Sequence, residues 1–122
     1  MRVSCIQFCS GKDIKENLKF SKQLILKAIK QKADFIVTPE TSSFFGLNKK
    51  KLLQMTTSMN KDIYLNGIRD IAKGYKKWIL TSIIIKEKNK IKNRSILINP
   101  KGLIQTYYDK IHMYDAILSP KE

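Results

Sequence analysis

The sequence predicts an α/β fold in which a βαβαβ unit leads into an antiparallel meander, so that the sheet is mixed. Short β-branched runs alternate with longer segments of helical period as far as residue 85. Two further apolar runs then follow at hairpin spacing. With 43% hydrophobic residues, the 122-residue chain can bury the core of one small domain over residues 1–122.

The first predicted elements are a strand and a long helix. Residues 2–9 carry apolar side chains on both parities, which is typical of a central strand covered on both faces. Asp13 stands where it can cap a helix over residues 14–32, with Glu16 at the capping-box position. The apolar residues of this helix fall largely on one stripe, so lysines coat its outer face.

A second strand delivers a carboxylate to the edge of the sheet. The apolar run 35–37 stops at Pro39, which cannot donate to a strand ladder, and Glu40 follows directly. The carboxyl end of a buried strand is where open α/β sheets bind ligands, although Glu40 could instead be a solvated loop residue. In the polar and aromatic loop 41–48, Phe45 is a candidate for lining a pocket. The loop contains two adjacent phenylalanines, Phe44 and Phe45, and at least one of them could instead pack into the core.

The second half of the sequence predicts a second crossover helix and strand, followed by the antiparallel meander. Asn89 suits the positive-φ position of a hairpin turn, and Pro100-Lys101-Gly102 forms another tight turn. The expected elements are a short helix or irregular lid over 49–59, a helix over 61–76, a strand over 78–85 buried on both sides, a strand over 94–99 and a strand over 103–108.

The net charge of +14 is consistent with a nucleic-acid or anionic membrane partner. However, the excess is almost all lysine, 21 residues against 3 arginines, and it is scattered along the chain. Specific recognition of bases and phosphates favours the bidentate fork of arginine. The charge therefore does not by itself predict nucleic-acid or membrane binding. No signal peptide is recognisable, and the expected location is cytoplasmic.

The two cysteines are expected to be reduced, buried thiols. On one strand Cys5 and Cys9 would lie ~13 Å apart, which is too far for a disulfide. Two cysteines without clustered histidines also give no metal signature.

Lys110 follows the last predicted strand, as Glu40 follows the second. A lysine held against a carboxylate in a partly buried cleft can polarise a carbonyl oxygen. A solvated surface charge is the alternative for any one of the 21 lysines. His112, the only histidine, is more simply a packed, hydrogen-bonded loop residue than a catalytic one.

Five sequence blocks stand out together in their order and spacing. They are the opening strand with Gln7, Val37-Thr38-Pro39-Glu40, Asn93-Arg94-Ser95, Asn99-Pro100-Lys101-Gly102, and Tyr108-Asp109-Lys110-Ile111-His112-Met113. Matched together, these blocks resemble the carbon–nitrogen hydrolase (nitrilase) superfamily over essentially the whole chain. The branch that they resemble most is that of omega-amidase and deaminated-glutathione amidase.

The resemblance implies the N-terminal half of a four-layer αββα sandwich, with a Glu-Lys-Cys catalytic set. Glu40 matches the general base, and Lys110 matches the lysine that stabilises the oxyanion. Phe45 and His112 are the candidate substrate-binding residues. The complete protein is expected to be a homo-oligomer that needs no metal or organic cofactor. It would hydrolyse small carboxylate mono-amides through a thioester acyl-enzyme and release ammonia.

The sequence differs from the family pattern because these 122 residues do not include the family's nucleophilic cysteine. The family's cysteine lies beyond the lysine, outside these 122 residues, whereas Cys5 and Cys9 both precede Glu40. We therefore expect this chain alone to be inactive, with residues 118–122 ending in a loop. The alternatives are a non-catalytic truncated module that pairs its uncovered sheet face with a partner, and a basic nucleic-acid-binding protein.

Overall fold

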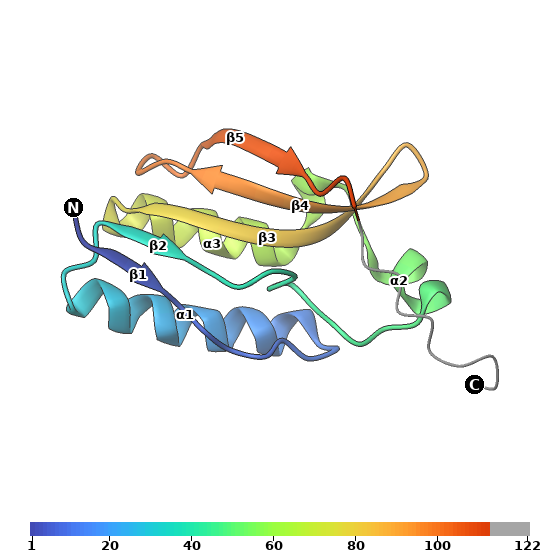
Figure 1. Ribbon diagram of the computed structural model, residues 1–122, viewed down its shortest axis with the longest axis horizontal. Helices are drawn as coiled ribbons and strands as arrows, with labels where there is room; N and C mark the ends of the chain where they lie inside the picture. The colour runs from blue at the N-terminus through green and yellow to red at the C-terminus, as the bar shows by residue number, and fades with distance from the viewer. Residues whose placement is uncertain (113–122) are drawn as a thin grey trace.

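The computed structural model describes residues 1–112, which form one five-stranded sheet with two long helices (Figure 1). The strands lie side by side in chain order. The pairs β1–β2 and β2–β3 are parallel, whereas β3–β4 and β4–β5 are antiparallel. This confirms the predicted mixed sheet. The strands are β1 (Val3–Cys5), β2 (Phe35–Val37), β3 (Trp78–Glu87), β4 (Lys90–Ile98) and β5 (Ile104–Asp109).

Capped helices connect the parallel strands. In α1 (Ile14–Lys30), the Asp13 carboxylate accepts the backbone N–H groups of Lys15 and Glu16, as the sequence predicted. Asp62 caps α3 (Ile63–Tyr75) in the same way, by accepting the N–H of Leu65. Two short elements precede α3, namely α2 (Lys49–Met55) and the 3₁₀-helix η1 (Met59–Lys61).

The predicted turns of the meander are present. Lys88 and Asn89 both have positive φ, of 47° and 60°, which gives the twist that a two-residue hairpin needs. Gly102 has φ 75° in the turn between β4 and β5. A Cβ at Gly102 would lie 2.9 Å from the backbone oxygen of Arg69 in α3, so glycine is required there for space as well as for conformation.

The hydrophobic core lies between the sheet and the two helices. Along β3, the side chains of Ile79, Ile83 and Ile85 are fully buried, whereas Trp78, Leu80 and Ile84 on the opposite face are half-buried. From the helices, Ile25 of α1 and Ile68 of α3 join this core. A Cβ on Gly67 of α3 would meet the Leu18 side chain of α1, so the two helices pack closely together.

The prediction that the strand over 78–85 is buried on both sides is wrong for the described residues. Residues Trp78, Leu80 and Ile84 are only half-buried. Both crossovers move along the sheet in the same direction, and right-handed crossovers then place both helices on one face. The opposite face, here called the open face, carries no helix among residues 1–112.

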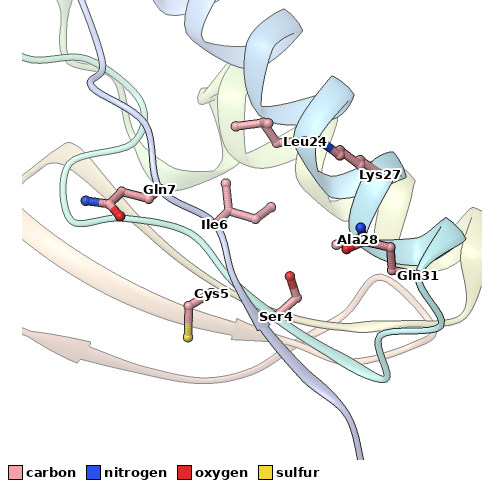
Figure 2. Close-up of a pocket in the computed structure, with 8 residues that line it drawn as sticks. All are labelled: Ser4, Cys5, Ile6, Gln7, Leu24, Lys27, Ala28 and Gln31. Carbon is pink, nitrogen blue, oxygen red and sulfur yellow. The ribbon is translucent and has the colours of Figure 1, made fainter.

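The expectations for the opening strand are also corrected. Among residues 1–112, β1 is a three-residue strand at the sheet edge, not a central strand covered on both faces. Cys5 and Cys9 are free but exposed, so the predicted burial of these thiols is wrong. Cys5 is exposed because it points to the open face, whereas Ser4 and Ile6 point towards α1 (Figure 2).

Residues 113–122 lie outside the described part of the chain. They include Met113 of the last sequence block and the loop expected over residues 118–122. No helix within residues 1–112 is long and apolar enough to cross a membrane.

Candidate active site

The side chains of Glu40 and Lys110 meet on the open face of the sheet. The Lys110 Nζ lies 2.6 Å from Glu40 Oε1, although the two residues are 70 positions apart. The same carboxylate oxygen accepts a second hydrogen bond, from Asn93 Nδ2 at 2.8 Å. A shallow cleft surrounds these three polar groups. It is lined by Glu40, Ser82, Asn93, Ser95, Tyr108 and Lys110.

Backbone pairing with β3 fixes the segment that carries Glu40. One residue past β2, the N–H of Thr38 donates to the Leu80 carbonyl at 2.9 Å. Beyond Glu40, the N–H of Ser42 donates to the Ser82 carbonyl, also at 2.9 Å. The chain therefore bulges away from β3 between Thr38 and Ser42, and Glu40 lies at the middle of that bulge. Its neighbour Thr41 has φ 52°.

Buried hydroxyl groups on the helix-covered side of the sheet hold this bulge in place. The Thr38 hydroxyl lies 2.7 Å from the hydroxyl of Thr81 on β3, and Ser42 Oγ donates to Thr38 Oγ1 at 2.9 Å. Nearby, Tyr64 of α3 and Ser21 of α1 form a 2.8 Å hydrogen bond in the core. None of the buried side-chain polar atoms among the described residues lacks a partner. A fully satisfied buried network of this kind restrains the backbone that it holds.

Strands β4 and β5 deliver the other groups of the cleft. Asn93 and Ser95 point to the open face from β4, where Ser95 hydrogen-bonds Ser82 of β3 at 2.8 Å. Lys110 follows β5 directly, and its N–H donates to the Asn93 carbonyl at 2.9 Å. One residue of β4 therefore binds Lys110 through its backbone and Glu40 through its side chain.

The ion pair lowers the pKa of Glu40 below the ordinary glutamate value. The hydrogen bond from Lys110 is the main cause; partial burial opposes it, and the Lys110 charge and the Asn93 hydrogen bond reinforce it. The carboxylate is therefore ionised at neutral pH and able to accept a proton. Both side chains remain accessible, with 57% of Glu40 and 39% of Lys110 exposed. The arrangement places a base and a cationic hydrogen-bond donor within reach of one bound carbonyl compound.

The structure does not bring the other sequence candidates into this cleft. Phe45 is 60% exposed and His112 is exposed, and neither lines the cleft. The adjacent Phe44 is buried, which confirms that one of the two phenylalanines packs into the core. Cys5 and Cys9 do not line the cleft either.

Sequence reasoning assigned no role to four residues that line the cleft, and only the sheet register reveals them. Asn93, Ser95 and Tyr108 belong to the sequence blocks that resemble the family, and this could have marked them as candidate site residues. Ser82 is the register partner of Ser95, and Tyr108 pairs with Ser95 on the other side. Alternation along three paired strands therefore gathers these side chains on one face.

A second hollow lies between β1 and α1 (Figure 2). Ser4 of β1 and Ile6, one residue past β1, face it from one side, and Leu24 and Ala28 face it from the helix. It contains neither Glu40 nor Lys110, so it is separate from the candidate active site. In the described residues 1–112, no three His, Cys, Asp or Glu side chains are grouped so that they could hold a metal ion.

Comparisons with known proteins support the sequence resemblance. The nitrilase and fragile histidine triad fusion protein NitFhit of Caenorhabditis elegans is 24% identical over 123 residues, which cover 98% of this chain and 28% of NitFhit. The deaminated glutathione amidase of Yersinia enterocolitica is 28% identical over 118 residues, which cover 93% of this chain and 41% of that enzyme.

Solved structures show the same fold. The crystal structure of C. elegans NitFhit matches with a TM-score of 0.83 at 24% identity, over 98% of this chain and 30% of that one. An amidase from Nesterenkonia sp. matches with a TM-score of 0.81 at 20% identity, over 95% of this chain and 44% of that one. The chain thus spans less than half the length of these proteins.

The sequence profile of the carbon–nitrogen hydrolase family matches residues 2–122, almost the entire chain. The fold matches part of the fold of these structures. The chain therefore belongs to the carbon–nitrogen hydrolase family.

Proposed function

We propose that this chain supplies two of the three catalytic groups of an amidase, with Glu40 as the general base and Lys110 as the oxyanion stabiliser. The observation that carries the proposal is the 2.6 Å contact between these two side chains in the open-face cleft. Its relatives include proteins named amidases, which supports an amide as the class of substrate.

The proposed mechanism starts with a cysteine thiol delivered to the cleft from outside residues 1–122. Glu40 takes the thiol proton, because a free thiol is only a few per cent thiolate at neutral pH. The thiolate attacks the amide carbon and forms a carbon–sulfur bond, while Lys110 stabilises the negative oxygen of the tetrahedral intermediate. The carbon–nitrogen bond then breaks, and the proton passes from Glu40 to the departing nitrogen, which leaves as ammonia or an amine.

The second half of the proposed reaction regenerates the site. Glu40 takes a proton from water, and the resulting hydroxide attacks the thioester. The carbon–sulfur bond breaks, the acid leaves and the thiol recovers its proton. Both halves use Glu40 as a proton acceptor, and the hydrogen bonds from Lys110 and Asn93 keep its carboxylate ionised at neutral pH.

Small mono-amides that carry a free carboxylate are the proposed substrates. A chain with a net charge of +14 attracts anionic molecules over a distance set by the ionic strength. Lys110 itself can attract a negatively charged group while it polarises the carbonyl oxygen. We further propose that the complete protein is a homo-oligomer and that its second half covers the open face, because this face exposes Tyr108 and leaves Leu80 and Leu97 only half-buried.

The first experiment is to determine whether the coding sequence continues beyond codon 122, and to express the complete protein. Ammonia release from a dicarboxylic mono-amide is then compared among the complete protein, Glu40→Gln and Lys110→Ala. We expect each substitution to lower kcat by ~10²-fold or more, as loss of a general base or an oxyanion donor does. The isolated 122-residue chain should release no ammonia above the uncatalysed rate.

Matched controls carry the same chemical changes away from the cleft. Glu16→Gln in the first turn of α1 and Lys101→Ala in the β4–β5 turn are both exposed and should retain the activity of the complete protein. Activity of the Glu40 or Lys110 variants within a few-fold of wild type would refute the assigned roles. If the reading frame stops at residue 122 and no second chain supplies a cysteine, the amidase proposal fails for this protein.

A further inference from the structure

Arg94 is a fully buried charge on the face of β4 that is turned away from the candidate active site. Its side chain is only 2% exposed. The guanidinium binds Asp109 with two hydrogen bonds, from Nε at 2.6 Å and from a terminal nitrogen at 2.9 Å. It also stacks over the Tyr107 ring at 3.9 Å and lies 3.3 Å from Glu87.

Such a group is costly to bury, and its partners explain how it is tolerated. A buried guanidinium loses its hydration and needs close, well-directed acceptors in compensation. The two parallel hydrogen bonds to one carboxylate provide the geometry in which arginine binds most tightly. The pKa of Asp109 is accordingly lowered to about 2, chiefly by the hydrogen bond from Arg94. Two apolar side chains could fill the same space, so packing alone does not explain why a buried ion pair is present here.

The strand register supplies that reason. Arg94 and Asp109 are direct partners in the β4–β5 pairing. Their neighbours in sequence, Asn93 and Lys110, point to the opposite face, because successive strand residues alternate. On that face both neighbours bind the same oxygen of Glu40.

Within residues 1–112, few hydrogen bonds hold Lys110 apart from its bond to Glu40. It lies one residue beyond the end of β5, where backbone hydrogen bonds open most easily. Its backbone N–H donates to the Asn93 carbonyl, and its side chain reaches the exposed cleft. Asp109, the last residue of β5, is bound by Arg94 and also by Lys92 Nζ of β4 at 3.1 Å. Bonds that hold Asp109 also restrict the start point and direction of Lys110.

We propose that Arg94 and Asp109 are positioning residues, which clamp the end of β5 so that Lys110 stays against Glu40. This inference rests on the proposed function for its catalytic meaning, but the clamp itself is a property of the 122-residue chain. Neither residue touches the cleft.

The test measures the pKa of Glu40 by carbon-13 NMR on the 122-residue chain. Lys110→Ala first establishes how far the pKa of Glu40 rises when the lysine is absent. Asp109→Asn removes one arm of the clamp. If the clamp positions Lys110, the variant should raise the pKa of Glu40 by at least half of the Lys110→Ala shift. The Lys110 amide should also exchange its hydrogen faster.

The sign of this change separates positioning from simple electrostatics. Removing the Asp109 charge would by itself lower the pKa of Glu40, because a nearby like charge raises a carboxylate's pKa. Glu87→Gln is the matched control, since it removes the β3 carboxylate that binds Arg94 and Lys92 and keeps the bonds of both residues to Asp109. This control should not raise the pKa of Glu40.

Arg94→Lys provides a second variant with no change in net charge. Lysine cannot reproduce the two-pronged bond to Asp109, so the pKa of Glu40 should rise here as well. Slow exchange of core amides in β3 serves to show that each variant is folded. If Asp109→Asn does not fold, Arg94→Lys decides the outcome.

Two results would overturn the inference. One is a pKa of Glu40 that stays at the wild-type value or falls in the folded clamp variants. The other is a Lys110→Ala variant that leaves this pKa unchanged, since the lysine would then not be positioned at all. The measurement needs no turnover, so a failure to find amide hydrolysis would refute the proposed function and leave the clamp standing.

Discussion

Replacing Gly102 by alanine tests the packing of the β4–β5 turn against α3. The residue has φ 75°, a left-handed conformation that costs an alanine about 1–2 kcal/mol. The added Cβ would lie 2.9 Å from the backbone oxygen of Arg69 and 3.0 Å from Cβ of Lys73. Neither atom belongs to the flexible end of a side chain, so the turn must move away from the helix. Overpacking of this kind costs about 1–3 kcal/mol.

Together these two effects should lower the free energy of unfolding by roughly 2–5 kcal/mol, a large share of the roughly 5–15 kcal/mol typical of a domain. Urea denaturation followed by circular dichroism measures it. With a mid-range slope of about 2 kcal/mol per molar urea, the midpoint should fall by about 1–2.5 M.

Gly74 provides the matched control for the same substitution. It lies in the last turn of α3 and has no positive φ, and a Cβ added to it would meet no atom within 4 Å. Alanine there should stabilise the protein by up to about 1 kcal/mol, because it reduces the backbone entropy lost on folding. The reasoning is refuted if Gly102→Ala unfolds within about 0.5 kcal/mol of wild type, or if both variants lose equal stability.

Three further outcomes follow from the site and the core. The pKa of Asp109 falls from 3.8 to about 2 on folding, so its ionised carboxylate should add about 1–2 kcal/mol to the free energy of unfolding above pH 4. This contribution is lost as the pH drops towards 2. In acid denaturation, Asp109→Asn should therefore lose less stability with falling pH than wild type. Asn93→Ala should raise the pKa of Glu40 in an NMR titration, because the carboxylate loses a hydrogen bond. Ile83→Ala should lower the free energy of unfolding by about 2–5 kcal/mol in urea, because Ile83 is fully buried.

Each of these outcomes has a clear contrary result. An acid-unfolding curve that is the same for wild type and Asp109→Asn would show that this carboxylate does not gain stability on folding. An unchanged Glu40 titration in Asn93→Ala would mean that the amide does not bind the carboxylate. Ile111→Ala is the control for the core substitution, since Ile111 is 74% exposed and its loss should change the free energy of unfolding very little. Equal losses of stability in Ile83→Ala and Ile111→Ala would contradict the burial argument.

Local patterns in the sequence were sufficient to predict most of the elements. The Asp13 cap, the helical stripe that follows it and the Asn89 turn are each set by residues within a few positions of one another. Hydrogen bonds of caps and turns form between near neighbours, so short-range patterns identify them well. The boundaries of helices and strands agreed within a few residues except at β1, where only Val3–Cys5 form the strand.

Burial was harder to predict than secondary structure. Apolar residues on both parities of residues 2–9 and 78–85 indicated strands covered on both faces, but among residues 1–112 only one face is covered by helices. An apolar side chain indicates that its surface is buried in the functional protein. It does not indicate which segment or partner buries it. The exposed thiol of Cys5 follows from the same cause.

The sequence by itself determined the order of strands and helices, the family resemblance and the two candidate residues at strand ends, Glu40 and Lys110. Only the tertiary structure decided that these residues meet at 2.6 Å, that Asn93 joins them, and that Arg94 and Asp109 lie behind them. The physical reason is the register of β3, β4 and β5. Hydrogen bonds between strands that are far apart in sequence determine which side chains share a face, and no local pattern contains that information.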